Sequence, residues 1–292
     1  MILIDYSQVS LANILSFKKE LMAGNEAEIT NLIRHTTLSA IKAYKKKYGK
    51  EYGDIVICCD GRKYWRRDYF EFYKASRKKS RDASELDWGL IFDTLGKIRD
   101  EMIEHFPYKV IHLEQCEADD IIAVLAKGNQ EFGFGNEPVM IVSSDGDFKQ
   151  LHKWSNVSQF SPMVKKLIKV KPSEIKPNLV EHIVKGDAGD GIPNILSKDN
   201  HFVLAEGRQA TVSAKRLAEF VEKGFDACRT DEEKRNWQRN QTLVDFEFIP
   251  EDIQKLITDT HLNTKPKGDK MSIMNYLIAN RCRLLLDELE EF

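Results

Sequence analysis

The sequence predicts an α/β protein with a mixed, mostly parallel sheet flanked by helices, followed by a helical C-terminal region. The first observation is that three short apolar runs each lead into an aspartate. The runs are residues 2–4, 55–59 and 139–142, and the aspartates are Asp5, Asp60 and Asp145. Runs of this length bounded by turn residues are typical of buried strands, and parallel strands end at one edge of a sheet. The second observation is that strand and helix patterns alternate only as far as Pro172.

Before Pro172 the other elements follow from apolar spacing, because helical spacing indicates helices and short apolar runs indicate strands. The predicted helices are residues 8–22, 25–47 and 86–105, and the further strands are residues 108–113, 157–160 and 167–170. Asn25 and Glu28 have the spacing of a capping box at the start of the second helix. Residues 131–136 are rich in glycine and predict a turn rather than a phosphate-binding loop.

After Pro172 only helices are predicted. They are residues 179–184, 212–223, 231–246, 250–260 and 270–290. Between the first two, residues 185–193 place Asp187 and Asp190 among glycines, which let the backbone approach a ligand closely. The change of pattern predicts two domains, residues 1–172 and residues 173–292.

The composition is that of a soluble globular protein. The 292 residues carry a net charge of −2, and 42% of them are hydrophobic. The sequence has no run of 18 apolar residues and lacks a signal peptide's basic and apolar segments, so we expect neither a membrane span nor export. Five cysteines without metal-binding spacing indicate reduced thiols in a cytosol.

Acidic residues gather where the predicted sheet edge meets the starts of helices. The nine candidate metal ligands are Asp5, Asp60, Glu117, Asp119, Asp120, Asp145, Asp147, Asp187 and Asp190. In open α/β sheets, ligands bind outside the carboxyl ends of the strands. Carboxylates that converge there repel one another unless a cation neutralises them, and such oxygen ligands suit Mg²⁺ or Mn²⁺.

A structural explanation of each acidic group stays open at this point. Acids in the first turn of a helix complement its dipole, and Asp-Gly after a strand is ordinary turn chemistry. Three strands that deliver an acid to the same edge nevertheless favour a common site. Without the nine candidate ligands the net charge rises from −2 to +7, so the rest of the chain is basic.

Residues 62–81 hold nine basic residues, two acids and six interleaved aromatics. A solvated basic helix face is the alternative, but cations next to stacking faces are what a single-stranded or flapped nucleic acid requires. The candidate nucleic-acid-binding residues are Arg62, Lys63, Tyr64, Trp65, Arg66, Arg67, Tyr73, Lys78, Lys79 and Arg81.

In order and spacing, the acidic series and the sequence Tyr64-Trp65-Arg66-Arg67 resemble the flap-endonuclease family of 5′-nucleases. The resemblance covers nearly the whole chain. It implies a PIN-like nuclease domain, a helical arch at residues 62–85 and a helix-three-turn-helix module at about residues 179–222. A polar insertion follows Gly191-Ile192-Pro193 where the family has a tight Gly-x-Gly hairpin, so the resemblance leaves a monovalent-cation site open.

The resemblance implies a Mg²⁺-dependent 5′-3′ exonuclease, flap endonuclease and ribonuclease H that works by two-metal phosphodiester hydrolysis. Asp5, Asp60, Glu117 and Asp119 would serve the first ion. Asp145, Asp147 and Asp187 would serve the second, with Asp119 facing both ions. Asp120 and Asp190 would act through water. Lys74 and Arg77 would stabilise charge on the scissile phosphate, which makes them catalytic candidates together with Asp119.

The implied role is the removal of RNA primers and 5′ flaps during phage DNA replication in the host cytosol. The expected partners are DNA and RNA–DNA hybrids with a 5′ flap or 5′ end, a single-strand binding protein and a sliding clamp. We expect a monomer with no membrane contact. Two alternatives are a catalytically inert DNA-junction binding protein with a structural metal site, and a phosphomonoesterase with an aspartate nucleophile. The first would rarely gather so many acids, and the second leaves the basic aromatic segment without a purpose.

Overall fold

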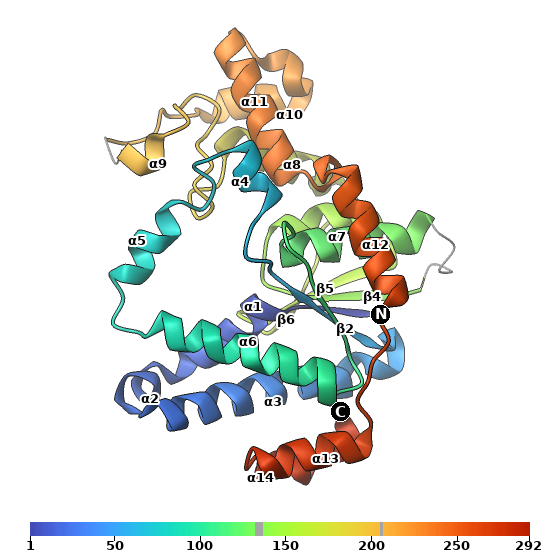
Figure 1. Ribbon diagram of the computed structural model, residues 1–292. Helices are drawn as coiled ribbons and strands as arrows, with labels where there is room; N and C mark the ends of the chain where they lie inside the picture. The colour runs from blue at the N-terminus through green and yellow to red at the C-terminus, as the bar shows by residue number, and fades with distance from the viewer. Residues whose placement is uncertain (132–136, 205–206) are drawn as a thin grey trace.

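The computed structural model describes residues 1–131, 137–204 and 207–292 (Figure 1). The glycine-rich turn predicted at residues 131–136 therefore lies, apart from its first residue, outside the described part of the chain. In the parts that are described, no helix combines the length and the apolar character needed to cross a membrane.

A six-stranded sheet in the order β3-β2-β1-β4-β5-β6 forms the centre of the molecule. The strands are β1 (Ile2–Asp5), β2 (Ile55–Cys59), β3 (Lys109–His112), β4 (Val139–Val142), β5 (Val157–Ser161) and β6 (Lys166–Ile168). All neighbours run parallel except β5 and β6. The mixed, mostly parallel sheet is thus confirmed, and β1 lies between β2 and β4. The three strands that lead into Asp5, Asp60 and Asp145 are adjacent.

Helices cover both faces of the sheet. On one face the core contains side chains of α1 (Tyr6–Ile14), α3 (Glu26–Tyr52) and α6 (Trp88–His105). On the other face it contains side chains of α7 (Ala118–Glu131), the 3₁₀ helix η2 (Asp147–Lys153) and α12 (Glu251–Asn263). The residues of β1 alternate between these cores, as the period of two in a strand requires.

The single helix predicted at residues 8–22 is wrong. The chain forms α1, the 3₁₀ turn η1 (Leu15–Phe17) and the short α2 (Lys18–Ala23) instead. The Asn13 amide donates to the Val9 carbonyl, and the Ser16 hydroxyl donates to the Asn13 carbonyl. Such side-chain bonds compete with the helical ladder and favour its interruption.

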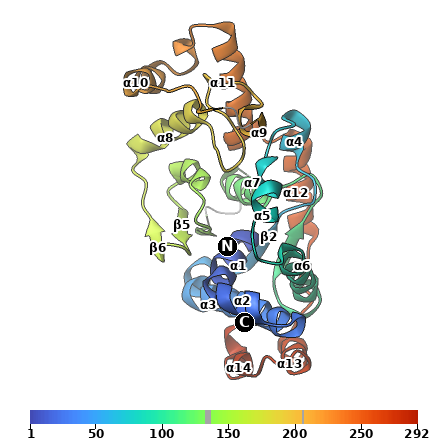
Figure 2. The same ribbon diagram turned by 90° about the vertical axis from the view of Figure 1, so that its left-hand side faces the viewer.

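A third core joins α8 (Pro172–Lys185), α10 (Ala214–Lys223) and α11 (Asp231–Val244) at one end of the molecule (Figures 1 and 2). It also contains Phe70 and Tyr73, which come from the segment that carries α4 (Trp65–Tyr69) and α5 (Ser76–Asp82). Helix α8 begins at Pro172, seven residues before the predicted start, with proline in the first turn where its missing N–H costs nothing. The short α9 (His201–Leu204) follows the loop after α8.

The end of the chain returns to the sheet. The 3₁₀ helix η4 (Phe246–Phe248) and α12 complete one face, while α13 (Lys270–Ala279), α14 (Arg283–Leu286) and the 3₁₀ turn η5 (Leu289–Glu291) pack below α3 and α6. The helix predicted at 270–290 is broken near Arg281, which has a φ of 55°. The apolar residues of 173–292 thus divide among three cores, so the predicted boundary at Pro172 does not separate two hydrophobic cores.

Candidate active site

Asp5 and Asp60 lie at the ends of neighbouring strands and are fixed by the starts of two helices. One Asp5 oxygen caps α1 by accepting from the Gln8 N–H at 3.1 Å, and the other accepts from the Ser143 hydroxyl at 2.9 Å. Asp60 accepts from the N–H of Ala118, at the start of α7, at 3.0 Å. Burial, with a further contribution from Asp60, raises the pKa of Asp5 to about 7.

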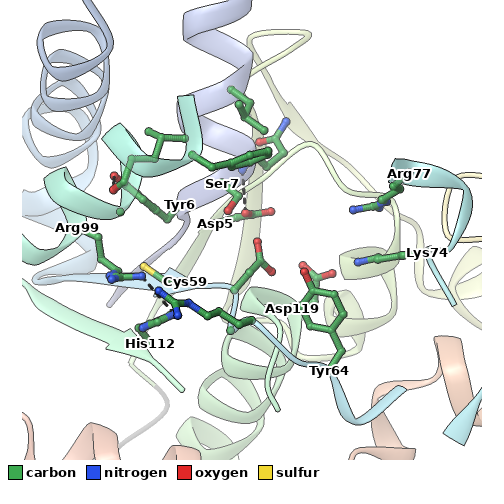
Figure 3. Close-up of a pocket in the computed structure, with 18 of the residues that line it drawn as sticks. Asp5, Tyr6, Ser7, Cys59, Tyr64, Lys74, Arg77, Arg99, His112 and Asp119 are labelled. Atoms are coloured by element: carbon green, nitrogen blue, oxygen red, sulfur yellow. Dashed lines mark hydrogen bonds between the residues drawn. The ribbon is translucent and has the colours of Figure 1, made fainter. Parts of the chain in front are cut away.

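Asp119 and Asp145 belong to the same group of acids. Burial and the charges of Asp145 and Asp5 hold the pKa of Asp119 well above its usual range. Burial and neighbouring Asp147 raise the pKa of Asp145 to about 6. Together with Asp60 and Asp190, these side chains line one cavity of about 870 Å³ (Figure 3). The structure thus brings acids from distant places in the sequence to one concave surface.

These residues fit a divalent cation. Carboxylates whose pKa is raised by burial and by one another gain most from a cation that neutralises them, and their oxygens are the donors that Mg²⁺ prefers. The carboxylates line one cavity and do not enclose a single point from all sides. Within residues 1–131, 137–204 and 207–292, no three Asp, Glu, His or Cys side chains form a compact ligand group.

His182 is a site residue that the sequence analysis missed. Its Nδ1 lies 3.0 Å from an Asp147 oxygen and its Nε2 lies 3.4 Å from an Asp187 oxygen. Burial opposes the imidazolium charge, but these two carboxylates outweigh it and raise the pKa of His182 to about 10. The only sequence signal is its place in the last turn of the helix before the Lys-Gly-Asp loop. Asp147 and Asp187 thus share a built-in cation.

Glu117 and Asp120, two of the predicted metal ligands, do not line the cavity. Asp120 accepts from Arg66 at 2.8 Å, from the Trp65 indole at 3.1 Å and from the Glu117 backbone N–H at 2.9 Å. Glu117 accepts from Arg66 at 2.9 Å and from the Tyr73 hydroxyl. Both carboxylates are essentially inaccessible to solvent and satisfied by these donors. They hold the start of α7 against α4.

Three of the candidate nucleic-acid-binding residues are buried in this network. Trp65, Arg66 and Tyr73 are only 8%, 3% and 3% exposed, so they have no surface on which a base or phosphate could lie. These three side chains pack and form hydrogen bonds inside the protein, which corrects the prediction that they bind nucleic acid. Tyr64 is half-buried, and the side chain of Lys78 is outside the described set. The exposed members are Arg62, Lys63, Arg67, Lys79 and Arg81.

Lys74 and Arg77 do reach the acids. Both line the cavity that contains Asp119 and Asp190 (Figure 3). The Lys74 ammonium pairs with Glu117 and lies 3.6 Å from Asp190, and the Arg77 guanidinium pairs with Asp190. The segment from residue 62 to 85 therefore presents two cations to the edge of the sheet where the strand-end acids lie.

A parallel α/β core with acids at its carboxyl edge and cations arching over them defines a class of nucleases with a resolvase-like domain. The chain belongs to the 5′-3′ exonuclease family. Residues 1–180 match the family described as 5′-3′ exonuclease, N-terminal resolvase-like domain, and residues 173–292 match the family described as T4 RNase H, C terminal. The protein is therefore a nuclease, a hydrolase of phosphodiester bonds.

Relatives agree with this assignment. The chain is 34% identical to ribonuclease H of Enterobacteria phage T4, over 99% of this chain and 95% of that protein. It is 24% identical to DNA polymerase I of Bacillus subtilis (strain 168), of which it spans only 28%.

Solved structures share the fold. The T5 5′-exonuclease with bound zinc ions gives a TM-score of 0.64 at 18% identity, with 90% of this chain and 98% of that chain covered. A T5 flap endonuclease variant in complex with DNA and metal ions gives 0.63 at 17% identity, with the same coverage.

Proposed function

We propose that this protein is a Mg²⁺-dependent 5′-3′ exonuclease and flap endonuclease that removes RNA primers and 5′ flaps during phage DNA replication. The observation that carries the proposal is that Lys74 and Arg77 share one cavity with Asp5, Asp60 and Asp119. This arrangement pairs hard oxygen ligands with cations suited to a phosphate. The names of the phage relatives, a ribonuclease H and a flap endonuclease solved with DNA, support the substrate class.

Two divalent ions, Mg²⁺ or Mn²⁺, are assigned to two groups of acids. Asp5, Asp60 and Asp119 would hold the first, and Asp145, Asp147 and Asp187 would hold the second, with Asp119 facing both ions and Asp190 acting through water. Bound there, the ions would supply Lewis-acid stabilisation of the attacking and leaving oxygens. Glu117 and Asp120 would not contact the ions directly. Glu117 positions Lys74, and Asp120 fixes the start of α7.

The cations of the chain orient the substrate. Lys74 is held between Glu117 and Asp190, so its ammonium is in place before the substrate arrives. Arg77 offers a planar fork that matches two phosphate oxygens. Both charges stabilise the negative charge that develops on the phosphate during cleavage. We expect products with a 5′-phosphate and a 3′-hydroxyl.

The setting of the reaction is also proposed. DNA and RNA–DNA hybrids with a 5′ flap or 5′ end are the substrates, and a monomer acts on them in the cytosol of the bacterial host. A single-strand binding protein and a sliding clamp would work beside it.

Cleavage of an end-labelled 5′-flap DNA and of a matched RNA–DNA hybrid, with Mg²⁺ and with EDTA, tests the proposal. We expect cleavage only with the metal. Asp119→Asn should remove nearly all of it and leave DNA affinity within a few-fold, because the basic residues carry the affinity. Calorimetric titration with Mg²⁺ should show weaker metal binding in the variant. Full turnover of Asp119→Asn at saturating Mg²⁺ would contradict the assignment.

A further inference from the structure

The two groups of acids differ in how open they are. Asp5, Asp60 and Asp119, which are assigned to the first ion, all line the cavity of about 870 Å³. Asp147 and Asp187 of the second group do not line it. They lie on a separate cavity of about 10 Å³, which Asp119 also lines. The first ion therefore has open access to its ligands, whereas the second ion does not.

The small cavity is too narrow for a divalent ion together with its water. A space of about 10–15 Å³ is the least that holds one water molecule, and Mg²⁺ in proteins usually keeps several. The side chain of His182 forms part of the wall of this cavity. An ion can therefore bind between Asp147 and Asp187 only if a side chain of the wall moves.

His182 uses the carboxylate oxygens that the second ion would need. Its Nδ1 lies 3.0 Å from Asp147 Oδ1, and its Nε2 lies 3.4 Å from Asp187 Oδ2. The other oxygen of Asp187 accepts from the N–H groups of Gly189 and Asp190 at 2.7 and 3.1 Å. Both oxygens of Asp187 and one oxygen of Asp147 are thus engaged within the protein.

The ring of His182 can move while its helix stays in place. His182 lies in the last turn of α8, and its side chain is 21% exposed. The neighbouring Val180, Ile183 and Val184 are buried in the third core and hold the helix. A partly exposed side chain changes rotamer by rotation about its own bonds, on a timescale far shorter than that of binding. His182 is therefore the movable part of the wall.

We propose that His182 is a positioning residue that competes with the second divalent ion for Asp147 and Asp187. Its ring either contacts the two carboxylates, as in this structure, or rotates away and leaves them to the ion. The inference rests on the proposed function, because it needs the two ion sites assigned there. The first ion meets no such competitor. The two ions therefore bind in order, and His182 weakens the binding of the second.

His182→Ala and His182→Lys test this competition. His182→Ala removes the ring and leaves the oxygens of Asp147 and Asp187 available to an ion. His182→Lys keeps a side chain that donates to carboxylates, so it should continue to compete. His201→Ala is the control, because His201 belongs to the same C-terminal region and lines neither cavity.

Binding of Mn²⁺ is measured by calorimetry without DNA at one fixed pH, and circular dichroism verifies that each variant is folded. The wild-type protein should bind one ion tightly and one weakly. His182→Ala should strengthen the weaker step about tenfold, as expected if the open form is populated roughly one time in ten, and leave the tighter step unchanged. In His182→Lys the weaker step should be no tighter than in the wild-type protein, and His201→Ala should match the wild-type protein in both steps.

A second measurement uses the wild-type protein alone. The imidazole NMR signal of His182, one of seven histidines, is assigned from its absence in His182→Lys and followed during a Mg²⁺ titration. The signal should shift with the weaker step, because the ring then loses its contacts with Asp147 and Asp187. A merely structural contact would leave the signal in place during that step.

The outcomes separate this inference from the proposed function. An unchanged weaker step in His182→Ala, or a His182 signal that stays in place during that step, overturns the competition. The proposed function stands in that case if the wild-type protein cleaves the 5′-flap DNA with Mg²⁺. A single bound Mn²⁺ in both the wild-type protein and His182→Ala overturns the assignment of two ions and this inference with it. Two binding steps without cleavage overturn the proposed activity alone.

Discussion

Lys74 shows how the backbone prepares a single functional side chain. Its φ of 56° is a left-handed conformation that costs energy for a residue other than glycine. Two contacts stabilise this strained conformation. The Lys74 N–H donates to the Asp190 carbonyl at 2.7 Å, and Gly191 packs closely against the Phe72 carbonyl. The buried ammonium is thereby directed at Glu117 and Asp190. A strained, buried and charged residue in a cavity is typical of a functional position.

Lys74→Ala should lower the cleavage rate of a 5′-flap DNA by on the order of 100-fold while changing affinity little, because the lost charge acts mainly in the transition state. Single-turnover rates at saturating enzyme, together with affinity in EDTA, measure the two effects separately. Lys255→Ala is the control and should match the wild-type rate. A change in KM alone would make Lys74 a substrate-positioning residue.

His261 makes stability depend on pH at a position far from the acids. Burial, the Lys109 ammonium and the N-terminal ammonium lower the pKa of His261 to about 4. In the unfolded chain it titrates near roughly 6.5. Between these two values the unfolded state binds more protons, so this residue makes stability fall as pH decreases from about 6.5 to 4.

His261→Gln should flatten that part of the pH dependence. Urea unfolding at pH 7.5 and at pH 5, in EDTA, should show a smaller loss for the variant than for the wild-type protein. Equal losses in both proteins would mean that His261 is protonated in the folded state at pH 5.

At the scale of elements, the segment that carries α4 and α5 divides its cations between two tasks. Arg66 is buried and donates to Glu117, Asp120 and the Leu243 carbonyl, so it ties α4 to α7 and to the end of α11. Its neighbour Arg67 is exposed and lies 5.4 Å from the Tyr64 ring. One turn of helix thus points one arginine into the protein and the next into solvent.

Neutralising these two neighbours should have different consequences. Arg66→Gln should lower the free energy of unfolding by about 3–5 kcal/mol, because it removes the guanidinium charge that two buried carboxylates share. Arg67→Gln should leave stability within about 0.5 kcal/mol and flatten the salt dependence of single-strand binding by roughly 0.7. Chemical denaturation and salt titrations measure both. Similar effects of the two substitutions would contradict the division of tasks.

At the scale of the whole molecule, the last residues of the chain support the nuclease core. Leu277 is fully buried beside the helices on one face of the sheet. Tyr276 joins Arg34 of α3 and Glu101 of α6 through hydrogen bonds of 3.0 and 2.7 Å. Lys42 of α3 pairs with Glu288. The end of the chain is therefore part of the fold that positions β1 and Asp5.

Leu277→Ala should cost about 2–5 kcal/mol of unfolding free energy, as expected for a fully buried leucine. Leu284→Ala, only seven residues away but 71% exposed, should cost less than about 0.5 kcal/mol. Both can be measured by urea unfolding followed by far-UV circular dichroism. If Leu277→Ala were as mild as Leu284→Ala, the C-terminal helices would be an independent appendage.

The sequence by itself determined the strands, the mostly parallel arrangement of the sheet and the aspartates that follow three of its strands. These features follow from apolar runs of a few residues and from the rule that parallel strands end at one edge. Asp5, Asp60 and Asp145 could therefore be assigned to one site from their positions in the sequence alone. Lys74 and Arg77 could be named only through the family resemblance.

Only the tertiary structure decided which charged and aromatic residues face the cavity. Arg66 and Arg67 look alike in sequence, and Arg66 is distinguished by partners 51 and 54 positions away. Tyr276 meets Arg34 across 242 positions, so no local pattern could place the last helices in the first core. Periodicity reports the secondary structure of a segment, whereas burial and ion pairing depend on what the rest of the chain packs against it.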